Sequence, residues 1–215
     1  MTRCKICCIA SEAEARLAIA HGAHAVGLVS EMPSGPGVIG LDRIAAIAAT
    51  VPPGVSSFLL TSKVTAAQII AQHRVARTSV LQLVDRVADG ELRALREALP
   101  GVKLVPVIHV RGEDDVAEAR AKASFADALL LDSGDPAAGE LGGTGRVHDW
   151  KLSARIVREA GVPVFLAGGL TPDNVGDAIA AVRPYAVDVC SGLRPGGALD
   201  EGMLRAFLAR VRVTA

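Results

Sequence analysis

Short apolar runs alternate with longer, alanine-rich stretches of helical periodicity along the whole chain. We expect the apolar runs to be strands, at Lys5–Ile9, Ala25–Val29, Ser57–Leu60, Val80–Leu83, Lys103–Val110, Ala128–Asp132, Val164–Ala167 and Ala186–Val189. We expect helices between them, at Glu12–His21, Leu41–Ala49, Ala66–Val75, Gly90–Leu99, Glu113–Ala123, Trp150–Ala160, Pro172–Ala181 and Gly202–Val211. Repeated strand–helix units whose strands are apolar on both faces favour a closed barrel over an open sheet. The sequence therefore predicts an α/β fold, a single-domain (β/α)8 TIM barrel over residues 1–215.

The composition narrows the choice of partner and compartment. The 215 residues include 23 Lys plus Arg and 23 Asp plus Glu, so no basic excess points to nucleic acid or to an anionic membrane. No apolar run approaches the roughly 20 residues of a membrane helix, and the N-terminus has no signal-peptide pattern. Four cysteines do not make a disulfide scaffold in a chain of this size. We expect a cytoplasmic monomer or homodimer whose partner is a small molecule.

Glycine-rich turns follow the last three predicted strands, at Gly142–Gly145, Gly168–Leu170 and Ser191–Leu193. Glycine lets backbone N–H groups approach an anion closely, and the start of a following helix adds a favourable dipole. Barrels of this kind often bind phosphate after their seventh and eighth strands. The turns therefore predict a phosphate site, although a strand-to-helix turn also uses glycine for purely conformational reasons.

Cys7 and Asp132 are the candidate base and acid. Lys5, Cys7 and Ile9 share one face of the first strand, and Cys4 points to the other face, which argues against a Cys4-x-x-Cys7 metal or redox site. Asp132 ends an otherwise apolar strand, where a carboxylate is costly in the interior but useful at the rim. A thiol and a carboxyl group at one barrel mouth suit proton transfer on a sugar. The alternative interpretations are an apolar core role for Cys7 and a capping role for Asp132.

Three other ionisable residues near strand or loop ends have no clear role from the sequence. Asp188 stands one residue before the end of its strand and is equally compatible with a structural role. His109 and His148 have no obvious partner, so both stay unassigned.

Motifs in the same order along the chain resemble those of the phosphoribosylanthranilate isomerases of tryptophan biosynthesis. They are Lys5-Ile6-Cys7-Cys8-Ile9, Gly22-Ala23-His24-Ala25-Val26-Gly27, Leu130-Leu131-Asp132-Ser133, Gly142-Gly143-Thr144-Gly145 with Asp149-Trp150, Gly168-Gly169-Leu170-Thr171-Pro172-Asp173-Asn174-Val175, Arg183-Pro184-Tyr185-Ala186-Val187-Asp188-Val189 and Ser191-Gly192. The resemblance implies an Amadori rearrangement with Cys7 as general base and Asp132 as general acid, and no metal or organic cofactor. It also implies phosphate contacts at Gly143, Thr144, Gly145, Gly168, Gly169, Ser191 and Gly192.

The departures from this family pattern concern the aglycone half of the substrate. The family has an arginine for the anthranilate carboxylate where this chain has residues 34–39 without one, and Gln-Leu-His-Gly is replaced by Gln82-Leu83-Val84-Asp85. Gln82 and Arg194 are the possible substrate contacts, with Arg194 as the first candidate for a replacement cation. Cys8 stands for a glycine and Cys190 for a serine.

Two alternatives therefore stay open beside an isomerase of phosphoribosylanthranilate. One is a paralogous isomerase of a different phosphorylated sugar amine. The other is a barrel that binds a phosphorylated metabolite without turnover.

Overall fold

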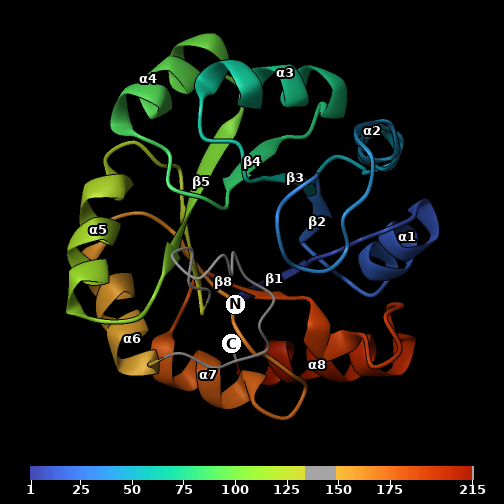
Figure 1. Cartoon of the computed structure of the whole chain (residues 1–215). Helices are drawn as coiled ribbons and strands as arrows, with labels where there is room; N and C mark the ends of the chain where they lie inside the picture. The colour runs from blue at the N-terminus through green and yellow to red at the C-terminus, as the bar shows by residue number, and fades with distance from the viewer. Residues whose placement is uncertain (134–148, 215) are drawn as a thin grey trace.

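The chain folds into a closed parallel barrel in which each strand pairs with its neighbours in sequence and β1 pairs with β8 (Figure 1). This is a computed structural model, and it describes residues 1–133 and 149–214. The strands are β1 Arg3–Ile6, β2 Ala25–Val29, β3 Ser56–Thr61, β4 Val80–Leu83, β5 Lys103–His109, β6 Leu129–Asp132, β7 Val164–Leu166 and β8 Ala186–Val189. The predicted (β/α)8 barrel is confirmed.

Helices form a ring outside the strands (Figure 1). They are α1 Glu12–Ala20, α2 Leu41–Ala49, α3 Ala66–Ala76, α4 Asp89–Ala98, α5 Glu113–Ala123, α6 Trp150–Glu159, α7 Val175–Val182 and α8 Glu201–Thr214, with a 3₁₀ turn, η2, at Ser191–Leu193. Within the described residues, no helix is long and apolar enough to cross a membrane.

Side chains alternate between two separate apolar layers, as the pleat of a strand requires. Cys4, Ile6 and Leu28 belong to the large outer cluster between strands and helices. Cys7 and Phe58 belong to a smaller cluster that fills the barrel interior. The inward and outward faces of β1 therefore match the predicted alternation up to Cys7.

The end of β1 departs from the prediction. The strand ends at Ile6, and Cys8 adopts a left-handed conformation with φ of 60°. This turn breaks the alternation, so Ile9 packs in the outer layer and the expectation that it shares a face with Cys7 is wrong. A left-handed φ favours glycine, which explains the glycine that the family motif has at this position.

Local signals placed one helix start correctly and another incorrectly. Helix α1 begins at Glu12 as expected, and Ser11 caps it, because the Ser11 Oγ accepts a hydrogen bond from the Glu14 N–H. The expected start of α7 at Pro172 is wrong, because the helix begins at Val175 after Asn174. Asn174 instead closes the preceding turn, with its side-chain oxygen accepting from the Thr171 N–H.

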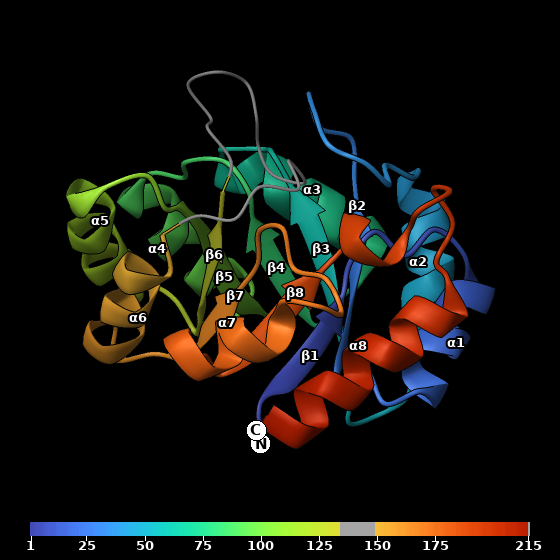
Figure 2. The same ribbon diagram turned by 90° about the horizontal axis from the view of Figure 1, so that it is seen from below.

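The loops that follow the strands gather at one end of the barrel, and the start of β1 and the end of α8 lie together at the other (Figure 2). Parallel strands bring their carboxyl ends to the same rim, where barrel enzymes have their active sites. Side chains from distant parts of the sequence therefore meet there.

Candidate active site

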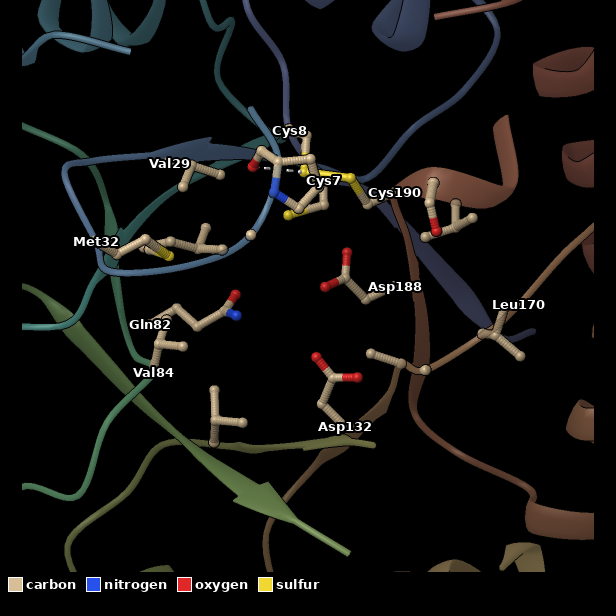
Figure 3. A pocket seen from close by; sticks show the side chains of 18 of the residues that line it. Cys7, Cys8, Val29, Met32, Gln82, Val84, Asp132, Leu170, Asp188 and Cys190 are labelled. Carbon is tan, nitrogen blue, oxygen red and sulfur yellow. Dashed lines mark hydrogen bonds between the residues drawn. A yellow bond between two sulfur atoms is a disulfide. The ribbon is translucent and has the colours of Figure 1, made fainter. Parts of the chain in front are cut away.

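A cavity opens among the strand ends and the loops after them. Figure 3 shows Cys7 and the joined Cys8 and Cys190 on one side, Gln82 and Met32 on another, and the carboxyl groups of Asp132 and Asp188 directed into the space between. The predicted pair of Cys7 and Asp132 is therefore brought to one cavity.

Cys7 is a free, buried thiol at the end of β1. Burial raises its pKa to about 11, against the lowering effect of the Lys5 ammonium and of the Cys8 backbone N–H. Cys4, also free, lies in the outer layer, where burial raises its pKa well above the ordinary value. The two thiols therefore differ in access to the cavity, and only Cys7 lines it.

Asp132 ends β6 and lines the same cavity. Its Oδ1 accepts a 2.7 Å hydrogen bond from the Ser133 N–H. Burial raises the pKa of the carboxyl group, which outweighs the lowering by that hydrogen bond and by His109 on β5. A raised pKa shifts the carboxyl group toward its protonated form, which is the form that a general acid needs.

Two ionisable residues of the barrel interior received no site role from the sequence. Lys5 is fully buried, and its Nζ lies 2.7 Å from Oδ2 of Asp188. Asp188 lines the cavity, and its Oδ1 has no hydrogen-bond partner among the described residues. The sequence did contain a signal for this ion pair, since β1 and β8 each have a charged residue between two apolar ones. A charged residue in such a strand is rarely buried without a partner.

The loops after β7 and β8 place glycine at the cavity. Gly168, Gly169 and Ser191 line it, and both glycines have positive φ, at 87° and 62°. Gly192 lets these two loops touch, because a Cβ there would lie 1.9 Å from the carbonyl oxygen of Leu170. The third predicted phosphate turn, with Gly143, Thr144 and Gly145, lies outside the described residues.

Arg194, the first candidate for a replacement cation, is bound by other residues of the described chain. Its guanidinium donates to both carboxylate oxygens of Glu14 at 2.9 Å and to the carbonyl oxygen of Cys7 at 3.4 Å. Its side chain is only 6% exposed, and the residue is not among those that line the cavity. Arg194 thus ties α1 to the loop after β8, and its charge is balanced by Glu14.

The cavity wall beside Cys7 is apolar, and the loop after β2 forms part of it. Met32, Pro36, Val84 and Leu60 line it, and no Lys or Arg is among the described residues that line the cavity. Gln82 lines it as predicted, with its side-chain oxygen buried and without a partner within the described chain. This wall can take a flat apolar group and offers one amide for hydrogen bonding.

Cys8 and Cys190 form a disulfide between the segment after β1 and the segment after β8. Their Cα atoms lie 5.8 Å apart, inside the range that disulfides span. The sequence reasoning excluded a disulfide scaffold and missed this single bond. The 182 residues between the two positions hid the pairing, because only closure of the barrel brings β1 beside β8.

We expect reduction of this disulfide to lower the free energy of unfolding by about 2–4 kcal/mol, because the bond closes a long loop in the unfolded chain. Urea unfolding with and without dithiothreitol measures the change. The Cys190→Ser variant is the control, since it has no bond to lose and its midpoint should not respond to reductant. An unchanged midpoint for the parent protein, with free thiols confirmed by mass spectrometry, contradicts this prediction.

Within residues 1–133 and 149–214, no three His, Cys, Asp or Glu side chains are grouped to hold a metal ion. The cavity instead contains buried groups that can exchange protons, Cys7, Asp132 and Asp188, beside glycine turns. Together with the closed barrel, this defines the chain as a (β/α)8-barrel enzyme.

Comparison with known proteins gives the family. The family model of N-(5'-phosphoribosyl)anthranilate (PRA) isomerase matches residues 5–210. The N-(5'-phosphoribosyl)anthranilate isomerase of Methanocella arvoryzae is 37% identical over 215 residues, which is all of both chains. The chain belongs to the N-(5'-phosphoribosyl)anthranilate isomerase family and is therefore an isomerase.

Solved structures agree with this assignment. Phosphoribosyl anthranilate isomerase from Thermus thermophilus superposes with a TM-score of 0.84 at 28% identity, covering all of both chains. A second phosphoribosyl anthranilate isomerase, in complex with reduced 1-(o-carboxyphenylamino)-1-deoxyribulose 5-phosphate, gives a TM-score of 0.83 at 27% identity and covers 99% of this chain and 100% of that one.

Proposed function

We propose that this chain converts N-(5'-phosphoribosyl)anthranilate into its aminoketose in tryptophan biosynthesis, by acid–base catalysis. The single observation that supports the chemistry is the pairing of Cys7 with Asp132 in one cavity beside the glycine turns. Family membership supports the substrate. The compound bound in the related structure, a phosphorylated deoxyribulose with a carboxyphenylamino group, has the outline of the product of such a reaction.

In the proposed mechanism Asp132 is the acid and Cys7 the base. Asp132 donates its proton to the furanose ring oxygen as the C1–O bond breaks, and the nitrogen lone pair forms the C1=N bond of a Schiff base. Cys7, as thiolate, then removes the proton on C2, and the electrons of that bond form the C1=C2 bond of an enolamine while the nitrogen regains its lone pair. The enolamine tautomerises to the ketose. Each positioned proton transfer contributes about 10² to 10⁴ to the rate.

The remaining cavity walls suit the two ends of this substrate. Backbone N–H groups of Gly168, Gly169, Ser191 and Gly192 are the proposed phosphate contacts within the described chain, with Gly143, Thr144 and Gly145 as further candidates. The apolar wall at Met32 and Val84 would receive the aromatic ring. Gln82 would donate a hydrogen bond from its amide.

We further propose that the chain acts as a single domain in the cytoplasm. Its partner is the small-molecule substrate, and it needs no nucleic acid, membrane or cofactor. The balanced charge and the absence of a basic run support this reading. Whether it acts as a monomer or a homodimer is decided by measuring its mass in solution.

The proposal is tested by following the fluorescence of phosphoribosylanthranilate with the purified protein. Turnover at a rate sufficient to restore growth of a tryptophan auxotroph is expected. Absence of turnover, with the sugar phosphate still bound in a displacement assay, would contradict it.

One observation favours a second candidate, an isomerase of another phosphoribosylated amine. The described part of the cavity lining has no cation for an anthranilate carboxylate. Losing one charge-assisted contact costs about 1.5–3 kcal/mol, or roughly 10- to 150-fold in affinity. Faster turnover of a phosphoribosylated aniline than of the anthranilate compound would support this candidate.

We expect Gly27→Ala to lower kcat/KM by about 10²-fold, because small misplacements of a catalytic group have effects of that size. A Cβ at Gly27 would lie 2.8 Å from Sγ of Cys7, so the methyl group must displace the thiol. The steady-state assay measures the effect. Gly90→Ala is the control, because its Cβ would meet nothing within 4 Å and its activity should match the parent. Equal activity of both variants contradicts the proposed position of the base.

A further inference from the structure

Lys5 is a fully buried cation of the barrel interior, and its partner Asp188 lines the cavity. It pairs in register with Asp188 across the β1–β8 contact, and its Nζ donates a 2.7 Å hydrogen bond to Oδ2 of that residue. The ring of Phe58 lies 5.2 Å from the ammonium group. An ammonium group has three donors, and Asp188 takes one of them. The lysine is therefore held in one place with donors left for other neighbours.

The ammonium group and the thiol of Cys7 converge on the same point of β2. A Cβ at Gly27 would lie 2.8 Å from Sγ of Cys7 and 3.0 Å from Nζ of Lys5. Glycine at this position leaves room for both groups. The two atoms therefore lie within the ~4–6 Å over which one charge alters the ionisation of another.

The charges in the barrel interior are not balanced. Lys5 faces two acids, Cys7 and Asp188, and Asp132 lies across the cavity with His109 beside it. Arg194 contacts Cys7 only at its carbonyl oxygen, and its charge is paired with Glu14. One ammonium group therefore interacts with a carboxylate and a thiol at once. Within residues 1–133 and 149–214, it is the cation that lowers the pKa of the thiol.

We propose that Lys5 is a positioning residue, whose buried ammonium group, oriented by Asp188, favours ionisation of Cys7 to the thiolate where the base must act. This inference rests on the proposed function, in which Cys7 is the base. If the inference is correct, the two charged neighbours of the thiol have opposite effects on its ionisation. Lys5 favours the thiolate, and the Asp188 carboxylate disfavours it.

The experiment measures the rate of alkylation of Cys7 by iodoacetamide against pH, without reductant, with the labelled site identified by mass spectrometry. In Lys5→Met the midpoint should rise by about one pH unit or more, as expected for loss of a nearby opposite charge. In Asp188→Asn the midpoint should fall, because the thiol becomes the main acidic partner of the ammonium group. A merely structural role for these residues would not produce shifts of opposite sign.

Lys103→Met is the matched control. Lys103 also pairs with an aspartate, with its Nζ 3.2 Å from Oδ1 of Asp127, but at the start of β5 and exposed. In Lys103→Met the pH midpoint of Cys7 alkylation should equal that of the parent. Thermal unfolding shows whether each variant is folded, and if Lys5→Met does not fold, Asp188→Asn alone still decides the sign.

The pH profile of kcat/KM provides a second readout. Lys5→Met should lose most activity near neutral pH and regain it as the pH rises, because the thiol must then ionise without help. Unchanged alkylation midpoints in Lys5→Met and Asp188→Asn, or shifts of the same sign, would overturn the inference. Full activity of Cys7→Ala would instead overturn the proposed base and leave the thiol titration interpretable.

Discussion

Replacing Cys7 with alanine is expected to lower kcat/KM by at least 10²-fold and up to about 10⁴-fold, the range for removal of a positioned base. The thiol lines the cavity from the end of β1, and no other thiol reaches the cavity unpaired, since Cys8 and Cys190 are joined. The loss should appear in kcat with little change in KM, because the thiol acts on C2 and does not hold the phosphate. Steady-state fluorescence kinetics measure both constants.

Cys4→Ala is the matched control for this substitution. Cys4 is also a free, buried cysteine of β1, but it packs in the outer layer. Its removal should alter stability while leaving kcat/KM near that of the parent. Comparable losses in the two variants would show that cysteine removal acts through the fold, and the proposed role of Cys7 would then be wrong.

Replacing Asp132 with asparagine is expected to lower kcat/KM by about 10² to 10⁴, because the amide cannot donate the proton that opens the furanose ring. The shape of the site should survive, since the side-chain oxygen of asparagine can still accept the Ser133 N–H bond. In the parent, burial raises the pKa of this carboxyl group. Its contribution should therefore be present at low pH and be lost as the pH rises through that raised pKa.

Asp85→Asn controls for the change from carboxyl to amide. Asp85 follows β4 and makes the same local bond, with its Oδ1 accepting a 2.7 Å hydrogen bond from the Arg86 N–H. It does not line the main cavity. This variant should keep the activity of the parent and its pH profile. A full-activity Asp132→Asn enzyme would contradict the assignment of the acid.

The barrel itself was predictable because its signals are local. Apolar strands of a few residues and alanine-rich helices repeat with the periodicities that their geometry demands, so strand positions such as Ala25–Val29 and Val80–Leu83 agree with the structure. The motifs also indicated that Cys7 and Asp132 lie at one barrel mouth, and both residues line the same cavity.

The features that were missed depend on contacts between residues far apart in sequence. The disulfide of Cys8 with Cys190 and the Lys5–Asp188 pair both form only when β8 closes on β1. Arg194 was the first candidate for a replacement cation because its charge was visible in the sequence, whereas its partner Glu14 lies 180 positions away. Helix α7 begins late because Asn174 satisfies the backbone of the turn before it.

The central claim is that a thiol and a carboxyl group flank the reacting carbons of a sugar whose phosphate is held by the turns after β7 and β8. A crystal structure of this protein with a reduced analogue of the ketose product tests it most directly. The account predicts Sγ of Cys7 and a carboxyl oxygen of Asp132 on the C1–C2 segment, with the phosphate against the backbone of Gly168, Gly169 and Ser191. An analogue bound with its phosphate elsewhere, or with C2 out of reach of Cys7, would contradict it.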